Sequence, residues 1–82
     1  GINMLEDVIY QAINENLPCS FLDVTGDGRH FEAVVVSESF VNQSLIKRHR
    51  MIYAALGERM KEEVHALSMK LHTVEEWSKL NG

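Results

Sequence analysis

The chain contains little cysteine, little proline and no long hydrophobic run. Among its 82 residues there is one cysteine, Cys19, and one proline, Pro18. A single cysteine cannot form a disulfide within the chain, which excludes a disulfide-stapled scaffold and favours a reducing compartment. No apolar stretch approaches the roughly 20 residues that cross a bilayer, and no export leader opens the sequence. We therefore expect a cytoplasmic protein with no membrane partner.

Positive charge is also scarce, and it is unevenly distributed. The formal net charge is −4, from eight Lys and Arg against twelve Asp and Glu. Because phosphate neutralisation needs clustered cations, this balance argues against a strong general nucleic-acid binder. Residues 39–57, however, contain no acid and hold three cations: Lys47, Arg48 and Arg50. A helix that presents them could lie along a DNA groove, dock an acidic partner, or simply be solvated.

Hydrophobic spacing predicts a helix and then a hairpin in the first half of the chain. Apolar residues recur every three or four positions over residues 4–17, which is typical of a helix with one buried face, and Pro18 closes it. The segments "SFLDV" and "HFEAVVVS" are rich in β-branched and aromatic residues. Asp27 and Gly28 lie between them and favour a tight turn, so the two segments are predicted to be antiparallel strands.

A second amphipathic helix is predicted to follow Ser44, which is a suitable N-cap. Its expected length is about 16 to 19 residues. The apolar spacing indicates one buried stripe, made of Leu45, His49, Ile52, Tyr53, Leu56 and Met60. The three cations are expected to point away from this stripe.

A third strand and a short helix are predicted to end the chain. The segment "VHALSMKL" alternates in polarity, so a strand should open near His65. Thr73 and the carboxylates after it favour a helix start, with Trp77 and Leu80 on its apolar face. The order αββαβα predicts one α+β domain over residues 4–82, with helices packed on a three-stranded sheet. Residues 1–3 are expected to be a remnant of an expression tag.

No residue spacing typical of a catalytic site is present. A nucleophilic enzyme needs a nucleophile, a base and an orienting group that converge, and no nucleophile elbow or comparable motif occurs. The "TGDG" segment lacks the lysine and the length of a phosphate-binding loop. We therefore expect that the protein is not an enzyme.

Four histidines make imidazole chemistry worth weighing, since imidazole binds iron, zinc and copper. Without a Cys-x-x-Cys or His-x-x-x-His motif, a self-contained metal site is not expected. Two imidazoles could still hold one iron of a two-iron cluster that a partner completes. The structural alternatives are a partly buried strand residue for His65, a core residue for His49 and an exposed loop residue for His30. His72 carries no distinct signal.

Three segments together resemble the BolA family over residues 5–77. They are "VVVSESF", "SLIKRHRMIYAALGE" and "VHALSMKLHTVEEW". The serine-x-phenylalanine connector, the Arg-His-Arg with a following tyrosine, the His-Ala-Leu and the final Glu-Trp stand in the family's order and spacing. Two departures are Asn42, where many members have glycine, and Val74, where many have proline. Asn tolerates a left-handed backbone, so neither departure threatens the fold.

The resemblance implies an αββαβα fold similar to a type II K-homology domain, with a helix-turn-helix-like region around the second helix. It implies binding to a monothiol glutaredoxin and a glutathione-ligated [2Fe-2S] cluster shared with it, in iron–sulfur assembly, trafficking or iron sensing. It also implies that some bacterial members act as DNA-binding transcriptional regulators linked to stress, morphology and biofilm formation. The isolated protein is expected to carry no cofactor and to be a monomer or weak dimer.

The resemblance also assigns residues. His65 of "VHAL" matches the family's cluster ligand, and His30 of "GDGRHF" matches the second ligand, from the loop between the first two strands. Lys47, Arg48 and Arg50 are expected to form an electrostatic surface for a partner or DNA. His49 is expected to anchor their helix in the core.

Overall fold

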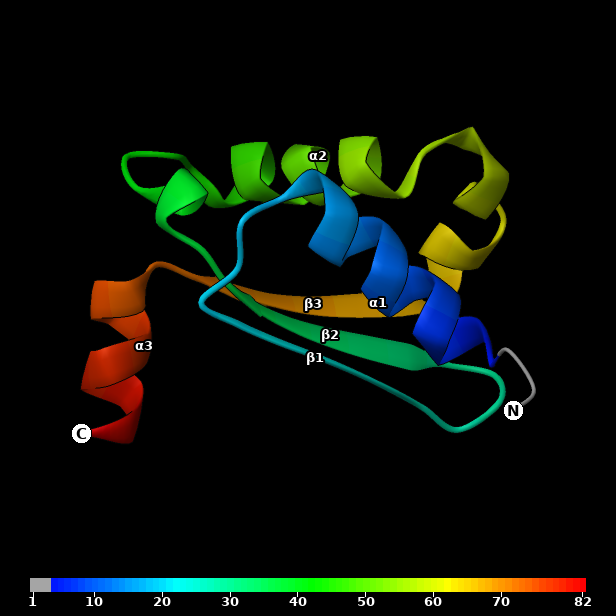
Figure 1. The fold of residues 1–82 in the computed structure, drawn as a ribbon, viewed down its shortest axis with the longest axis horizontal. Helices are drawn as coiled ribbons and strands as arrows, with labels where there is room; N and C mark the ends of the chain where they lie inside the picture. The colour runs from blue at the N-terminus through cyan, green and yellow to red at the C-terminus, as the bar shows by residue number, and fades with distance from the viewer. Residues whose placement is uncertain (1–3) are drawn as a thin grey trace.

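The computed structural model describes residues 4–82 apart from the Arg59 side chain, and they form a three-stranded sheet with two helices on one face and a third at one end (Figure 1). The suggested tag remnant, residues 1–3, lies outside the described residues. The main elements are α1 (Leu5–Asn16), β1 (Phe21–Gly26), β2 (Phe31–Val36), α2 (Leu45–Leu56), β3 (Leu67–His72) and α3 (Val74–Asn81). Short 3-10 helices connect them: η1 (Glu38–Phe40), η2 (Glu58–Met60) and η3 (Glu63–Ala66). The predicted α+β class and the order αββαβα are confirmed, whereas the likeness to a K-homology domain stays a prediction.

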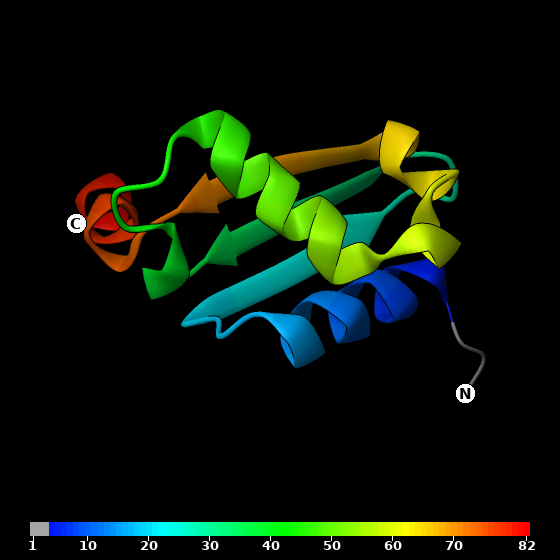
Figure 2. The same cartoon turned by 90° about the horizontal axis from the view of Figure 1, so that it is seen from above.

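Strand pairing gives the sheet two distinct ends. The order is β1-β2-β3, with β1 antiparallel and β3 parallel to the central β2. Phe31 pairs with Leu67 at one end, next to the β1–β2 loop, and we call this the hairpin end. Val36 pairs with His72 at the other, the α3 end. Both views in Figures 1 and 2 place α3 and the hairpin loop at opposite ends of the sheet.

The core lies between the sheet and the pair α1 and α2, which cover the same face (Figure 2). Alternation along β2 sends Phe31, Ala33 and Val35 toward the helices, because successive strand side chains point to opposite faces. The helices contribute apolar residues spaced three or four positions apart, which pack against these strand residues. The buried cluster comprises Ile9, Ala12, Ile13, Leu17, Phe31, Ala33, Val35, Phe40, Ile52, Leu56, Met60 and Leu71.

Local caps fix the connector before α2 as predicted. The Ser44 hydroxyl accepts a hydrogen bond from the Lys47 amide at 3.1 Å, which confirms it as the N-cap. Asn42 adopts φ of +63°, the left-handed conformation that glycine or asparagine tolerates best. The substitution of Asn for the family's glycine therefore keeps the connector's shape.

Helix α2 is shorter than predicted. It contains 12 residues, not 16 to 19, because Gly57 at φ of +77° takes the chain out of the helix. The Gly57 amide still donates to the Tyr53 carbonyl at 3.1 Å. Met60 reaches the core from η2 and not from a continued helix.

The buried side of α2 is rotated from the predicted stripe toward Arg48. Ile52 and Leu56 are buried as expected, but Leu45 is 61% exposed and Tyr53 is 42% exposed. The Arg48 side chain is only 11% exposed and lies above Ile52 on the inner side. The apolar stem of an arginine can pack inward when hydrogen-bond acceptors lie near its guanidinium group. Hydropathy patterns do not predict this arrangement.

Strand β3 begins at Leu67, so the expectation that His65 opens it is wrong. Ladder pairing needs a partner strand, and β2 begins only at Phe31, the residue paired with Leu67. The residues before Leu67 have no such partner and form η3. The predicted alternation is correct from Leu67 onward, where Ser68 and Lys70 are exposed and Leu71 is buried.

Candidate functional site at the hairpin end

His30 and His65 lie at the same end of the sheet, on neighbouring segments. His30 directly precedes Phe31 of β2, and His65 lies two residues before Leu67 of β3. Phe31 and Leu67 are paired, and adjacent strands run about 4.8 Å apart. Both imidazoles belong to exposed residues. The fold therefore places the two histidines that the resemblance assigned as ligands at the same end of the sheet.

Asp27 fixes the loop that carries His30. Its Oδ1 accepts hydrogen bonds from the amides of His30 at 2.7 Å and Arg29 at 2.9 Å. These bonds, that of His30 first, hold the pKa of the Asp27 carboxyl below its usual range. The His30 Nδ1 lies 3.7 Å from Asp27 Oδ2, and the side chain is 78% exposed. The loop backbone is thus held in place while the imidazole reaches solvent, as expected for an exposed loop residue.

His65 borders an open hollow between α2 and η3. The hollow measures about 420 Å³ and is lined by Tyr53, Ala54, Gly57, Glu58, Lys61, Val64 and His65. With the groups that the structure describes, which leave out the Arg59 side chain, the His65 side chain makes no hydrogen bond or ion pair. The alternative of a partly buried strand residue is wrong on both counts, since His65 is exposed and lies on η3.

Cys19, whose thiol is a group that can also bind iron, lies at the α3 end. It precedes β1, whose first residue pairs with Val36, so a six-residue strand of roughly 20 Å separates it from the histidines. Its thiol donates to the Leu17 carbonyl at 3.3 Å, and burial raises its pKa. Among the described residues, no group of three or more His, Cys, Asp or Glu could hold a metal ion. A metal at the hairpin end would therefore need further ligands from a partner.

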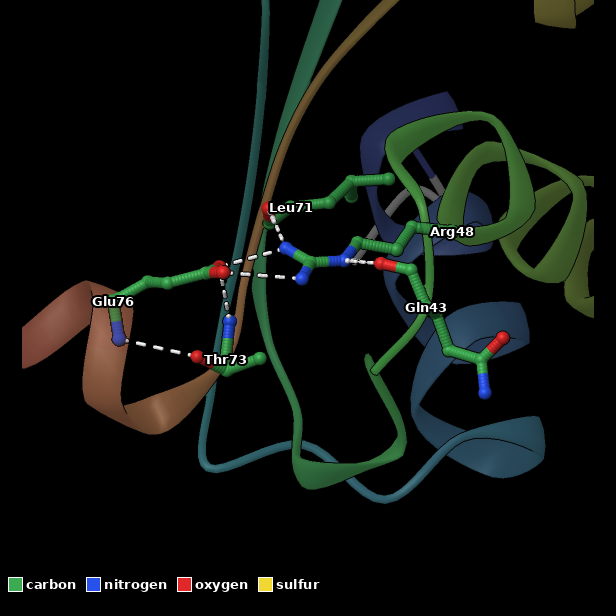
Figure 3. A network of polar contacts seen from close by, with 5 residues as sticks. All are labelled: Gln43, Arg48, Leu71, Thr73 and Glu76. Atoms are coloured by element: carbon green, nitrogen blue, oxygen red, sulfur yellow. Dashed lines mark hydrogen bonds and ion pairs between the residues drawn. The ribbon is translucent and has the colours of Figure 1, made fainter. Parts of the chain in front are cut away.

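A polar network centred on Arg48 joins α2 to α3 (Figure 3). The guanidinium donates to the Gln43 carbonyl at 3.0 Å and to the Leu71 carbonyl at 3.2 Å. It also grips both Glu76 carboxylate oxygens, at 2.7 and 3.1 Å. Glu76 and Thr73 complete a capping box, with bonds of 2.9 and 3.1 Å between each side chain and the other's amide. This confirms that Thr73 starts the last helix.

The network changes the interpretation of the basic helix. The bond from Arg48 and then that from the Thr73 amide lower the pKa of Glu76 to about 2. The expectation that Arg48 points away from the core is therefore wrong, because its donors are engaged inside the fold. Lys47 and Arg50 remain exposed. No short motif signals this pairing, since the bound partners of Arg48 lie far along the chain.

Exposed apolar residues lie beside Lys47 and Arg50 on α2. The sequence analysis did not predict that these apolar residues would be exposed. Leu45 and Ile46 are 61% and 66% exposed, although periodicity placed Leu45 in the core. His49, expected in the core, is half-buried and lies edge-on to the Tyr53 ring at a centroid distance of 6.4 Å. The outer side of α2 is thus mixed apolar and basic.

Aromatic stacking holds α3 against the sheet. Trp77 stacks on Phe21 with centroids 5.2 Å apart and lies 5.8 Å from the His72 ring. Leu80, expected on the same apolar face, is 67% exposed. His72 therefore has a packing role at the α3 end. None of the helices within residues 4–82 has the length and apolar character needed to cross a membrane.

Comparison with known proteins identifies the family. The family model described as BolA-like protein matches residues 13–76. The DNA-binding transcriptional regulator BolA of Escherichia coli K12 is 35% identical over 74 residues, which cover 90% of this chain and 65% of that protein. The acid stress protein IbaG of the same strain is 33% identical over 84 residues, which cover 98% and 95%.

A solved structure gives the same result. The structure of a BolA protein homologue from Coxiella burnetii superimposes with a TM-score of 0.76 at 41% identity, covering 94% of this chain and 99% of that one. Sequence and fold agree over nearly the whole chain. This chain belongs to the BolA-like family.

Proposed function

We propose that this protein is an accessory protein that binds a monothiol glutaredoxin and shares a glutathione-ligated [2Fe-2S] cluster with it. Its work would lie in iron–sulfur assembly, trafficking or iron sensing. The observation that carries the proposal is the placement of His30 and His65, both exposed at the hairpin end on the segments that lead into the paired residues Phe31 and Leu67. The proposal rests also on the family resemblance.

The donor set fits half of such a cluster. Besides the bridging sulfides, each iron needs two outer ligands, and imidazoles can replace two thiolates on one iron. His30 and His65 would supply these nitrogens, while the partner's thiolate and glutathione would supply the sulfurs on the other iron. Bound there, the cluster would supply one-electron chemistry or transferable iron, with a potential raised by the imidazole ligands.

The residues around the histidines serve to position them. The Asp27 carboxylate accepts from the amides of Arg29 and His30, so the loop presents the His30 ring from a fixed backbone. The hollow beside His65 leaves space for a partner to approach from the α2 side. Exposed imidazoles suit ligands that are shared between chains and not enclosed by one.

Cluster reconstitution tests the proposal. The protein, a monothiol glutaredoxin and glutathione are combined anaerobically with iron and sulfide, and visible absorption and circular dichroism are recorded. We expect a spectrum distinct from that of the glutaredoxin homodimer, abolished by His65→Ala and altered by His30→Ala. His72→Ala, at the α3 end, is the matched control and should keep the spectrum. An unchanged mixed-complex spectrum in His65→Ala would show that the ligand assignment is wrong.

The proposal includes the absence of catalysis and of a resident cofactor in the isolated protein, which would be a monomer or weak dimer. Within residues 4–82 neither ligand histidine is hydrogen-bonded to a serine or cysteine that it could activate. The mechanism we propose asks only for ligation. Sedimentation of the metal-free protein would reveal its assembly state directly.

A second candidate function is DNA binding in the cytoplasm. It is supported by the name of the E. coli relative and by Lys47 and Arg50, which are exposed in a segment without acidic residues. It predicts sequence-selective binding that weakens with salt, with a slope set by few phosphate contacts. The double variant Lys47→Glu, Arg50→Glu should then lose binding while keeping the fold. Equal affinity of wild type and variant for a duplex would remove α2 as the DNA-contacting element.

A further inference from the structure

The outer side of α2 exposes an apolar hollow that the fold does not use. Leu45, Ile46, His49, Arg50 and Tyr53 line a depression of about 300 Å³, which we call the α2 outer face. Three of its large apolar residues are exposed: Leu45 (61%), Ile46 (66%) and Tyr53 (42%). Single exposed apolar residues are ordinary, but a contiguous group that lines a hollow is typical of an interaction site.

Core packing does not require these residues. The inner side of the same helix already carries Ile52 and Leu56 in the core and Arg48 in the network with Glu76. The residues of the α2 outer face follow a four-residue spacing along 45, 49 and 53, which forms one stripe on a helix. Helix α2 therefore has two apolar stripes. One is buried in the core, and the other faces solvent.

The charge around the hollow selects the kind of partner. Lys47 and Arg50 are exposed beside the apolar stripe, and residues 39–57 contain no acid. A partner that buries this stripe therefore brings carboxylates to the rim with no repulsion from α2 itself. Tyr and Arg, both present here, are the residue types most often found at energetically important interface positions.

We propose that the α2 outer face is a docking site for an acidic amphipathic helix of a partner protein. The exposed side of a helix offers no free backbone donors to an extended strand, so another helix, packed ridge into groove, is the matching shape. A hollow of this size accepts one or two apolar side chains and lies at the lower limit of the range usual for small-molecule pockets. This inference goes beyond the cluster proposal and requires neither His30 nor His65.

Two other occupants fit the surface less well. In a symmetric pair of copies joined through α2, the same patch meets itself, which would set Lys47 and Arg50 against their own counterparts. DNA would pair with the two cations but would leave Leu45, Ile46 and Tyr53 against phosphate and sugar. An acidic helix satisfies both the cations and the apolar stripe.

A peptide titration tests the proposal. The probe is a synthetic helical peptide of about 14 residues, long enough to span α2, with leucines on one face and glutamates beside them. Two comparison peptides replace every glutamate by lysine or every leucine by serine. Fluorescence anisotropy gives affinities, and amide chemical shifts locate the contact. We expect the acidic peptide to bind at least roughly tenfold more tightly than either comparison peptide, with shifts confined to α2 and its flanks.

Matched variants sharpen the test. Ile46→Ser should weaken the acidic peptide by roughly tenfold or more, as for a central interface residue. Leu80→Ser is the control, because Leu80 is 67% exposed against 66% for Ile46 but lies on α3. Arg50→Glu should lower the affinity for the acidic peptide and reduce the effect of salt on that affinity. Lys79→Glu should change neither. His65→Ala should bind the peptide normally, which separates this surface from the cluster site.

Several results would overturn the proposal. They are no acidic-peptide binding at millimolar concentration, equal binding of the lysine peptide, or chemical-shift changes centred outside α2 and its flanks. Self-association that Ile46→Ser abolishes would assign the face to a second copy. Duplex DNA binding that depends on Ile46 and Tyr53 would assign it to nucleic acid.

Discussion

The two ends of the sheet are built in opposite ways. At the α3 end, Arg48 links α2, β3 and α3 through bonds to Leu71 and Glu76. Trp77 stacks on Phe21 there. At the hairpin end, the bonds around His30 stay inside its own loop, and with the groups that the structure describes the His65 side chain has none. Bonds between distant segments hold the α3 end together, whereas the hairpin end exposes the imidazoles of His30 and His65 to solvent.

This contrast predicts separate consequences for substitution. Bonds between distant segments stabilise the whole domain, because breaking them releases several elements at once. Exposed side chains bonded only within a loop contribute little to global stability. Substitutions at the α3 end should therefore change the free energy of unfolding, and those at the hairpin end should change ligand binding alone.

The largest effect is expected for Arg48→Ala. It leaves the Leu71 carbonyl and the Glu76 carboxylate without their donor, and it removes a packed apolar stem. We expect a loss of roughly 2–3 kcal/mol in the free energy of unfolding, measured by urea titration. Arg50→Ala, an exposed arginine on the same helix, is the control and should change stability by less than about 0.5 kcal/mol. Similar losses for both would remove the special role of Arg48.

Acid should act mainly through the α3 end. The Glu76 pKa is lowered from 4.5 to about 2 in the fold, so its contribution is complete above pH 4.5 and is lost as pH falls toward 2. Glu76→Gln should be less stable than wild type at neutral pH and should lose less stability across this window. Urea titrations at several pH values measure this, with Glu75→Gln as the control. Parallel curves for Glu76→Gln and wild type would contradict it.

A smaller effect is expected for Thr73→Ala. The substitution removes the hydroxyl that accepts from the Glu76 amide at 3.1 Å, which is one half of the capping box. Loss of such a cap lowers stability by about 1 kcal/mol. Ser78→Ala, within the exposed part of α3, should be close to neutral. Thermal unfolding of the two variants side by side is sufficient, and equal midpoints would argue against the cap's contribution.

The smallest stability effects are expected at the hairpin end. His30→Ala and His65→Ala should each change the free energy of unfolding by less than about 0.5 kcal/mol, because both rings are exposed. The same variants should nevertheless lose or alter the mixed cluster. A loss above about 1 kcal/mol in either variant would mean that these histidines belong to the structural framework.

Much of the fold could be predicted because its signals are local. The N-caps Ser44 and Thr73 bond residues only three positions away, and the turn at Asp27 and Gly28 joins adjacent strands. The left-handed Asn42 follows from a backbone preference of one residue. Such features are legible in a short window of sequence.

The prediction for α2 was wrong about Arg48, because contacts with residues far along the chain determine where its side chain points. The carbonyl of Leu71 and the carboxylate of Glu76 lie 23 and 28 residues after Arg48. A pattern of apolar residues places an arginine outside, and only the tertiary structure supplies the acceptors that bring it in. The same limit applies to the start of β3, which is set by where β2 begins.

The candidate site shows a similar division. The resemblance assigned His30 and His65 as ligands, and that role stays a prediction. Their placement at the same end of the sheet follows from the parallel pairing of β2 with β3, which no local signal in either segment contains. The exposed stripe of Leu45 and Ile46 escaped notice because apolar periodicity does not distinguish an inner face from an outer one.

The crossover between β2 and β3 has a consequence for the order of folding. The β1–β2 hairpin that carries His30 can form by local contacts, whereas β3 reaches β2 only after the chain has traversed η1, α2, η2 and η3. Long-range pairing of this kind forms late, because closing the loop costs chain entropy before the stabilising contacts can form. A nascent or partly unfolded chain therefore presents His30 without His65. The pair of imidazoles exists only in the finished domain, so any metal affinity that depends on both is coupled to folding.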